Sequence, residues 1–321
     1  MSFAIDGFAH VMPMSFAKKI SELHPTPQLK QLLEYAYFGD MENRVRVLDK
    51  YKIDKQVLTI ARPDIWMNMS KDLLFEMTRY ANDTVAEAAS KYPDRFIPVG
   101  TLPVPTEEFL PEFDRCMNEL GMAGIQVFSN VDGKYLDAPE FRAFFEKANA
   151  TKTPVWLHPQ LREEWSKEFI LHKIIGWPYD TTMAMCRLVL SGLMEQLPDL
   201  KIITHHLGGM VPYFSDRIKG FYDASTMYPD SDVVKLSRDP LEYFKCFYND
   251  TVLNGAVHAC ECGYEFFGAE HIIFASDYPF GPGDGETWMA AILKQMEQTD
   301  IPSAAKELIY SKNIEKLLDR S

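Results

Sequence analysis

Eight short apolar segments, rich in β-branched and aromatic residues, recur along the chain at strand length. They are residues 3–8, 56–60, 96–102, 124–128, 154–158, 201–205, 246–250 and 272–276. Between most of them lie segments with helical spacing of apolar residues, at 41–52, 70–91, 106–120, 138–149, 182–196, 254–267 and 286–298. Strands that alternate with helices predict a parallel sheet, and eight such units in about 250 residues or more is the count of a closed (β/α)₈ barrel.

An open, doubly wound sheet is the alternative, but the turn after the first strand argues against it. That strand runs into Asp6-Gly-Phe-Ala-His10, not into the Gly-x-Gly-x-x-Gly turn of a dinucleotide-binding fold. We therefore expect an α/β protein made of a single (β/α)₈ TIM barrel over residues 1–321. Long loops are expected at about 11–40 and 159–181, both at the end where a barrel holds its active site.

The charge balance restricts the partners. Thirty-three Lys and Arg against 46 Asp and Glu give a net charge of −13, which argues against a nucleic-acid surface and an anionic membrane. No apolar window approaches the roughly 18 residues of a membrane span.

Arg44 and Arg46, in the helical segment 41–52, are expected to be solvated.

Two features predict a cytoplasmic protein. The N-terminus lacks a basic segment and reaches Asp6 before an apolar stretch could form, so no signal peptide is expected. The five cysteines are odd in number and scattered, as is usual in a reducing compartment. They are Cys116, Cys186, Cys246, Cys260 and Cys262.

Four of the eight histidines fall at predicted strand ends, together with an aspartate. They are His10, His158, His205, His206 and Asp277. In a barrel these positions face the active site. Imidazole and carboxylate together suit a divalent metal such as zinc.

These strand ends also carry a resemblance to a known family. The chain resembles the amidohydrolase superfamily in its amidohydrolase-2 branch, and most closely the aminocarboxymuconate-semialdehyde decarboxylase family. The similarity covers nearly the whole chain. Its marks include Asp6-Gly-Phe-Ala-His10, Trp156-Leu-His158-Pro159, Gly176-Trp-Pro178, His206-Leu-Gly-Gly209 and Ser276-Asp-Tyr-Pro-Phe280.

The resemblance implies a metal-containing (β/α)₈ barrel and assigns roles to individual residues. His10, His158 and Asp277 correspond to metal ligands, with Asp277 also counted as catalytic. His206 corresponds to the histidine that acts as acid or base beside metal-bound water. Arg217 corresponds to an arginine that reaches a substrate carboxylate across a dimer interface, and Phe280 to an aromatic residue of the substrate pocket.

The chain departs from the family at Phe8, because the family has histidine or glutamate there and a phenyl ring cannot bind a metal. The metal is expected to be zinc, with manganese or iron as alternatives, and loss of the metal stays open. His205 or His206 could rotate in as a fourth ligand. Phe8, His205, Arg62 and Trp66 are further candidates for substrate contacts.

Three functions remain open at this level. The first is a metal-dependent, non-oxidative decarboxylase of a small unsaturated or aromatic carboxylic acid. The second is a hydrolase or hydratase that uses the same metal-bound water. The third is a non-catalytic binding barrel with a lapsed metal site. The expected partners are a small-molecule carboxylate and, through Arg217, further copies of the chain in a homodimer or larger homo-oligomer.

Overall fold

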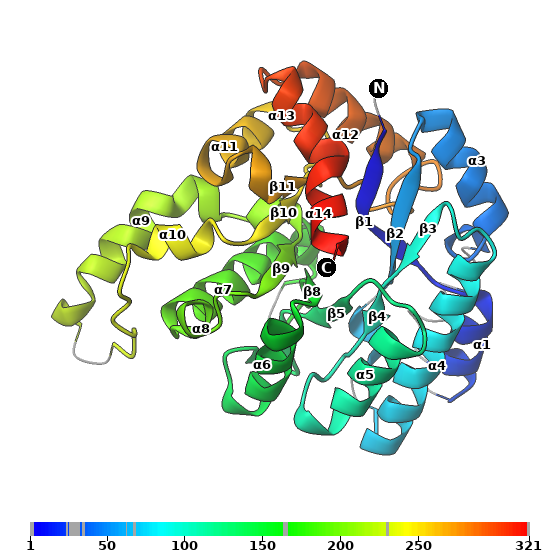
Figure 1. Ribbon diagram of the computed structural model, residues 1–321, viewed down its shortest axis with the longest axis horizontal. Helices are drawn as coiled ribbons and strands as arrows, with labels where there is room; N and C mark the ends of the chain where they lie inside the picture. The colour runs from blue at the N-terminus through cyan, green and yellow to red at the C-terminus, as the bar shows by residue number, and fades with distance from the viewer. Residues whose placement is uncertain are drawn as a thin grey trace.

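A computed structural model describes residues 3–23, 25, 33, 36–61, 63–66, 69–162, 166–228 and 231–319. Parallel strands form the centre of the molecule and helices surround them (Figure 1). The strands are β1 (Ile5–Val11), β2 (Lys55–Ile60), β3 (Phe96–Pro98), β4 (Gly100–Thr101), β5 (Ile125–Phe128), β8 (Pro154–His158), β9 (Lys201–Thr204), β10 (Tyr248–Asp250) and β11 (Ile272–Ile273). A short antiparallel pair, β6 (Asn130–Val131) and β7 (Lys134–Tyr135), lies outside this set.

The strands pair in two parallel runs that close on each other. One run has the order β1-β2-β3 and the other β11-β10-β9-β8-β5-β4. Val99, between β3 and β4, donates its amide to Leu58 of β2, so these two short strands act as one barrel strand. Gly7 of β1 donates to Phe274 after β11, and His10 donates to Tyr278, which joins the first strand to the last. The expected (β/α)₈ barrel is therefore confirmed.

The helices follow the strands in the order that the sequence predicts. They are α1 (Met14–Leu23), α3 (Met41–Tyr51), α4 (Lys71–Ser90), α5 (Leu110–Asn118), α6 (Arg142–Thr151), α7 (Trp177–Leu190), α8 (Leu193–Gln196), α9 (Val211–Asp223), α10 (Pro240–Phe244), α11 (Val257–Phe267), α12 (Glu286–Gln298), α13 (Ser303–Glu307) and α14 (Asn313–Leu318). The two long connections contain helical turns of their own, since α1 lies within 11–40 and α7 begins within 159–181. The extent of the domain over residues 1–321 stays a prediction.

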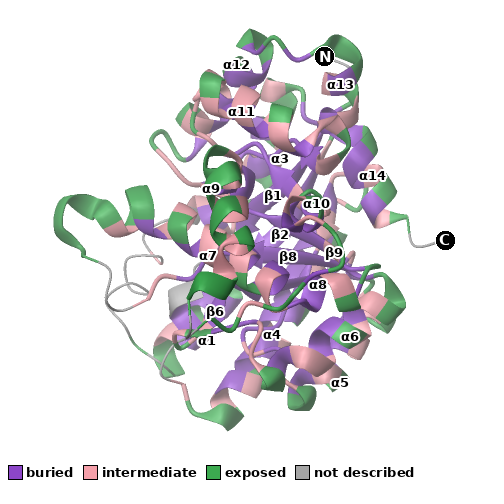
Figure 2. Ribbon diagram, turned by 90° about the vertical axis from the view of Figure 1, so that its left-hand side faces the viewer, coloured by how far each residue is buried: buried purple, intermediate pink, exposed green. Residues whose placement is uncertain are grey.

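Burial differs between the strands and the helices. All seven residues of β1 and all five of β8 are buried, as expected for strands covered on both faces. The helices bury one side only and expose the other (Figure 2). Local signals fix the helix ends: Asp40 caps α3 by accepting from the Asn43 amide, and Ser70 caps α4 by accepting from Leu73.

Among the described residues, no helix is both long and apolar enough to cross a membrane.

Candidate metal centre

Four strand ends bring three histidines and an aspartate together inside the barrel. His10 lies in β1, His158 ends β8, His205 follows β9 and Asp277 follows β11. One ring nitrogen of each histidine lies within 4.8 Å of those of the other two. The Asp277 Oδ1 atom lies 3.1 Å from His10 Nε2 and 3.3 Å from His205 Nε2. All four side chains are buried.

Each histidine uses Nδ1 for a contact that turns Nε2 toward the cluster. His158 Nδ1 donates to the Pro159 carbonyl at 2.7 Å. Thr59 Oγ1 donates to the Ala9 carbonyl and lies 2.8 Å from His10 Nδ1, so it accepts from that nitrogen. His205 Nδ1 contacts the Asp250 carboxylate, which can only accept while it is ionised.

The contact between His10 and Asp277 is what a cation site requires. With Nδ1 protonated, a neutral His10 presents a lone pair at Nε2, and Asp277 Oδ1 is also an acceptor. His10 Nε2 has no hydrogen-bond donor opposite it in the described part of the chain. Two acceptors 3.1 Å apart repel each other unless a proton or metal lies between them. The donor set therefore fits a divalent ion bound by imidazole and carboxylate.

The electrostatics of the cluster agree with this fit. Burial lowers the pKa of His10, and burial together with His10 and His205 lowers the pKa of His158 well below its usual value. Both rings are therefore neutral at pH 7, the form that binds metals. Although burial alone would raise it, hydrogen bonds with His10 and His205 hold the pKa of Asp277 well below its usual range. Burial alone would lower the pKa of His205, but Asp250 and Asp277 raise it to about 10, so a metal at this position would have to displace the Nε2 proton of His205.

Aromatic rings close one side of the cluster. The Phe8 ring is buried, with its centroid 4.5 Å from that of His205 and 5.5 Å from that of His10. Phe280 lies 5.3 Å from His10 and 5.2 Å from Phe38, again between ring centroids. Phe8 and Phe280 therefore border the same group of donors.

A buried polar chain supports β1 beneath the cluster. Arg44 Nη2 donates to the His10 carbonyl at 2.6 Å, and Arg44 Nη1 donates to Gln56 Oε1 at 2.8 Å. Gln56 donates in turn to Asp6, which also accepts from the amide and hydroxyl of Ser276. The expectation that Arg44 is solvated is thus wrong: its side chain is fully buried and reaches hydrogen-bond partners in β1 and β2.

A second buried network supports His158. The Ser129 amide donates to the His158 carbonyl at 2.9 Å, and Ser129 Oγ accepts from the Gln160 amide at 2.7 Å. Ser129 Oγ donates in turn to Asp180 of α7. Asn130 Nδ2 also donates to Asp180, at 3.0 Å, and to the Gln160 carbonyl at 2.6 Å. Asp180 therefore ties the turn after His158 to the start of a helix, a role for which the sequence offered no signal beyond a polar residue near Pro178.

The remaining predicted site residues have different surroundings. His206 is half-buried beside His205, with ring centroids 4.2 Å apart, and burial and the neighbouring His205 lower its pKa to about 3. Trp66 is buried and packs on Phe16 of α1. Arg217 is exposed on α9, where it stacks on Phe221, so the structure does not bring it into the cluster of its own chain. Arg62 lies outside the described residues.

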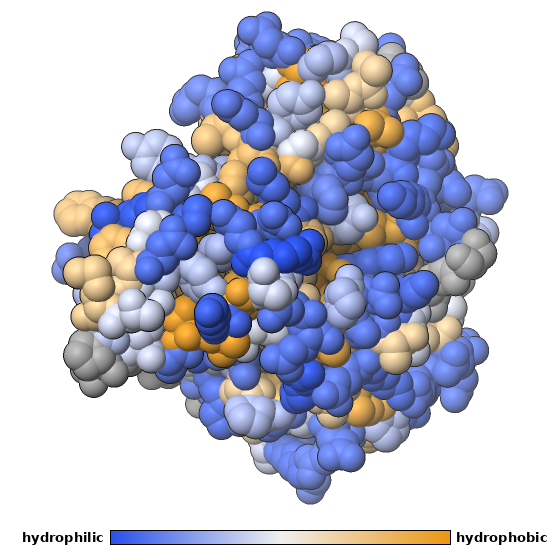
Figure 3. Space-filling model, turned by 60° about the vertical axis from the view of Figure 1, so that its left-hand side comes forward, coloured by the Kyte–Doolittle hydropathy of each residue, from blue (hydrophilic) through white to orange (hydrophobic). Residues whose placement is uncertain are grey.

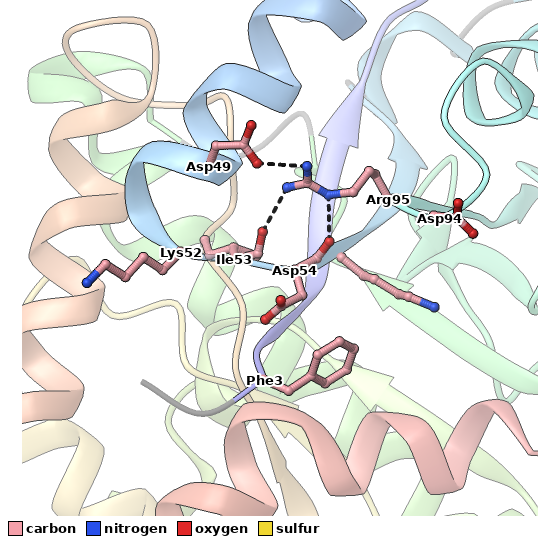
Figure 4. Close-up of a pocket in the computed structure, with 8 residues that line it drawn as sticks. Phe3, Asp49, Lys52, Ile53, Asp54, Asp94 and Arg95 are labelled. Carbon is pink, nitrogen blue, oxygen red and sulfur yellow. Dashed lines mark hydrogen bonds and ion pairs between the residues drawn. The ribbon is translucent and has the colours of Figure 1, made fainter.

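A cavity of about 520 Å³ lies at the opposite end of the barrel, where β1, β2 and β3 begin (Figure 4). Arg95 crosses it and donates to the Asp49 carboxylate and to the carbonyls of Ile53 and Asp54. Asp54 accepts from the Ala4 amide. These charged groups have partners within the chain, and the amino-terminal end of a barrel is the end that stabilises the fold.

Comparison with known proteins places the chain in a family. A sequence model described as amidohydrolase matches residues 28–320. The 2-amino-3-carboxymuconate-6-semialdehyde decarboxylase of Dictyostelium discoideum is 27% identical over 303 residues, which cover 88% of this chain and 83% of the relative. The gamma-resorcylate decarboxylase of a Rhizobium species is 28% identical over 265 residues, which cover 77% of this chain and 79% of that enzyme.

The solved structures agree. A dihydroxybenzoic acid decarboxylase from a Polaromonas species, with bound manganese and the inhibitor 2-nitroresorcinol, superposes with a TM-score of 0.81 at 26% identity. The match covers 99% of this chain and 97% of that one. A strand-end cluster of imidazole and carboxylate donors in a (β/α)₈ barrel defines a class of metal-dependent barrel enzymes. The chain belongs to the amidohydrolase family within that class, and it is an enzyme.

Proposed function

We propose that this protein is a metal-dependent, non-oxidative decarboxylase that acts on an aromatic carboxylic acid. The observation that carries the proposal is the convergence of His10, His158, His205 and Asp277 at the strand ends. The relatives in Dictyostelium and Rhizobium, named as decarboxylases, support the reaction class. The aromatic rings of Phe8 and Phe280 beside the cluster suit a planar substrate.

The cluster would hold one divalent ion through His10, His158 and Asp277. When bound, such an ion polarises the oxygen atoms of a substrate and lowers the pKa of a coordinated water. Zinc was the ion expected from the sequence, whereas the Polaromonas relative contains manganese. Manganese and zinc are therefore the first two ions to test, with iron as the third.

His206 would transfer the proton of the reaction. Decarboxylation breaks the bond between the ring carbon and the carboxylate, releases carbon dioxide and places a proton on that carbon. His206 is half-buried next to the cluster, and its lowered pKa keeps the ring neutral at pH 7, so it would take up a proton from solvent and pass it to that carbon. Its Nδ1 has no hydrogen-bond partner among the described residues. Asp277 Oδ1, which lies 3.1 Å from His10 Nε2 and 3.3 Å from His205 Nε2, would keep the neighbouring imidazoles oriented.

We further propose that the active unit is a homodimer in which Arg217 of one copy reaches the substrate carboxylate of the other. Arg217 lies on the exposed side of α9, a helix that also carries the exposed Tyr213, Phe214 and Phe221, and it stacks on Phe221. Tyr213 is 79% exposed, Met227 77% and Phe169 84%. Figure 3 shows the face with α9 and α7, where hydrophobic side chains reach the surface. An arginine beside exposed aromatic residues is typical of an interface centre.

Cytoplasmic location remains a prediction from the cysteine pattern.

The direct test is turnover. The protein, loaded separately with manganese and zinc, is incubated with hydroxybenzoates and with an unsaturated aminocarboxylic acid, and carbon dioxide and product are quantified. In deuterated water the product is expected to carry deuterium at the carbon that lost the carboxylate. A His206→Gln variant is expected to keep the metal and lose turnover by about 10²–10⁴-fold, the usual contribution of a general acid or base.

Two results would contradict the proposal. Hydrolysis of esters or lactones by the same metal-loaded protein, without carbon dioxide release from any acid, would favour the hydrolase alternative. Full turnover in His206→Gln would remove the proton-transfer role. Arg217→Ala tests the role of Arg217 independently of the metal site. This variant is expected to raise KM for the carboxylate substrate while the metal content stays unchanged.

A further inference from the structure

We infer that His205 is the fourth metal donor and that it replaces the donor that Phe8 removes from the first strand. This inference rests on the metal site of the proposed function and concerns which residues complete it. Phe8 and His10, two residues apart in β1, lie side by side with ring centroids 5.5 Å apart, and His10 reaches the cluster. Phe8 places a phenyl ring where the family has a metal-binding side chain, and this ring contacts His205.

The surroundings of His205 hold its ring in one orientation. Asp250, at the end of β10, accepts from His205 Nδ1. The other oxygen of Asp250 accepts from the Leu207 amide at 3.1 Å and the Val252 amide at 3.0 Å, so the carboxylate is itself fixed by backbone groups. A carboxylate that takes the Nδ1 proton orients the ring and leaves Nε2 for a metal, the usual arrangement around metal-binding histidines.

Phe8 fixes the same ring from its face. The two ring centroids are 4.5 Å apart with an interplanar angle of 31°, and both side chains are buried. Asp250 and Phe8 therefore hold His205 with Nε2 directed at Asp277 Oδ1, 3.3 Å away. His205 also meets His10 and His158 in the group whose ring nitrogens lie within 4.8 Å of one another.

The neighbouring histidine lacks these restraints. His206 has a positive φ of 57°, which turns it away from the strand path, and its Nδ1 has no partner in the described part of the chain. Adjacent residues of the sequence thus have separate tasks: His205 binds the metal and His206 stays free for proton transfer. Asp250 is a positioning residue that acts through His205.

The test compares metal binding in a set of four variants made in the full chain. Apo-protein is titrated with Zn²⁺ and with Mn²⁺ by calorimetry, and bound metal is counted by mass spectrometry. His205→Ala is expected to lose affinity for both ions. Asp250→Asn is expected to weaken binding by about 10–100-fold, as for other residues that orient a ligand. His206→Ala, the matched control one residue away, is expected to bind metal as the unmodified protein does.

The fourth variant restores the missing donor. Phe8→His in the His205→Ala background is expected to recover metal binding, because it returns an imidazole to the first strand. This rescue also guards against misfolding, since a protein that regains metal must have kept the barrel. Thermal unfolding of each apo-protein provides a second check on the fold.

Two outcomes would overturn the inference: unchanged metal affinity in His205→Ala, or a loss in His206→Ala equal to that in His205→Ala. Failure of the proposed function appears differently, as a protein that binds metal in the expected pattern but releases no carbon dioxide from any acid.

Discussion

The two ends of the barrel differ in how their ionisable side chains are placed: they are buried at one end and partly exposed at the other. At the carboxyl end of the strands, three histidines and Asp277 are buried together, with two acceptors facing each other. At the amino end, Arg95 spans a cavity and pairs with the exposed Asp49 and with two backbone carbonyls (Figure 4).

The difference shows which end carries chemistry. Exposed ion pairs contribute little to stability and can change without consequence for a distant site. Buried charges are costly unless each has a partner, so a buried cluster with facing acceptors indicates a site built for a ligand. The predictions below vary groups at one end or the other and are ordered from the largest expected change to the smallest.

Replacing Arg44 by Met tests whether the buried chain supports the site end. The variant removes a buried cation that interacts with Asp6 and also removes the bond to the His10 carbonyl, so we expect about 3–5 kcal/mol lower stability. Arg46→Met, two residues along α3 and exposed, is the control and should change stability by less than about 0.5 kcal/mol. Chemical denaturation measures both. Equal stability of the two variants would contradict the role of Arg44.

The pH dependence of stability should reveal the titration of the Asp6 carboxyl group. Burial outweighs the hydrogen bonds from Ser276 and Gln56 and raises the pKa of Asp6 to about 6, above its value of 3.8 in an unfolded chain. Protonated Asp6 therefore adds stability below pH 3.8, and this contribution is lost as the pH rises through about 6. The loss is roughly 3 kcal/mol.

The measurement is the free energy of unfolding between pH 4.5 and 7.5 for the unmodified protein and for Asp6→Asn. As the pH rises through this window, the free energy of unfolding of the unmodified protein should fall relative to that of Asp6→Asn. A difference independent of pH would show that Asp6 does not titrate there.

Asp180→Asn probes the network behind His158. Asp180 accepts from Ser129, Asn130 and Tyr135, and an amide with one acceptor oxygen cannot satisfy all three donors. We expect metal affinity to fall by about 10–100-fold. Asp137→Asn, which breaks an ion pair with Arg187 nearby, should leave the affinity unchanged. If both variants bind metal equally well, the network does not support the ligand.

The smallest effect is expected at the amino end. Arg95→Ala removes one partly exposed ion pair and two bonds to carbonyls, and should lower stability by about 1 kcal/mol. Metal content and turnover should not change. A loss of metal in this variant would break the contrast between the two ends.

The sequence was informative where pattern and local signals agree. The strands at 55–60, 125–128 and 154–158 were predicted within one residue, because each is a short segment rich in Val, Ile, Leu or aromatic residues. Helix α12 was predicted with the same bounds, 286–298. His10, His158 and Asp277 were predicted to lie together because they fall at or near the carboxyl ends of predicted strands, and the structure does bring them together.

The rest depends on contacts between distant parts of the chain. Arg44 carries no sign of burial in its own segment, since its partners Gln56 and His10 belong to other elements. The sequence also could not show which of His205 and His206 enters the cluster. The backbone turns at His206, and Asp250, which belongs to another strand, holds the ring of His205 in the cluster.

The central claim, that the strand-end cluster binds one divalent metal despite Phe8, is tested most directly by the metal content of the purified protein. Inductively coupled plasma mass spectrometry is applied to the unmodified chain and to His158→Ala, both after exposure to Mn²⁺ and Zn²⁺ and removal of free ion. We predict close to one ion per chain in the unmodified protein and a large loss in His158→Ala. Absence of metal from both proteins, or equal amounts in the two, would contradict the account.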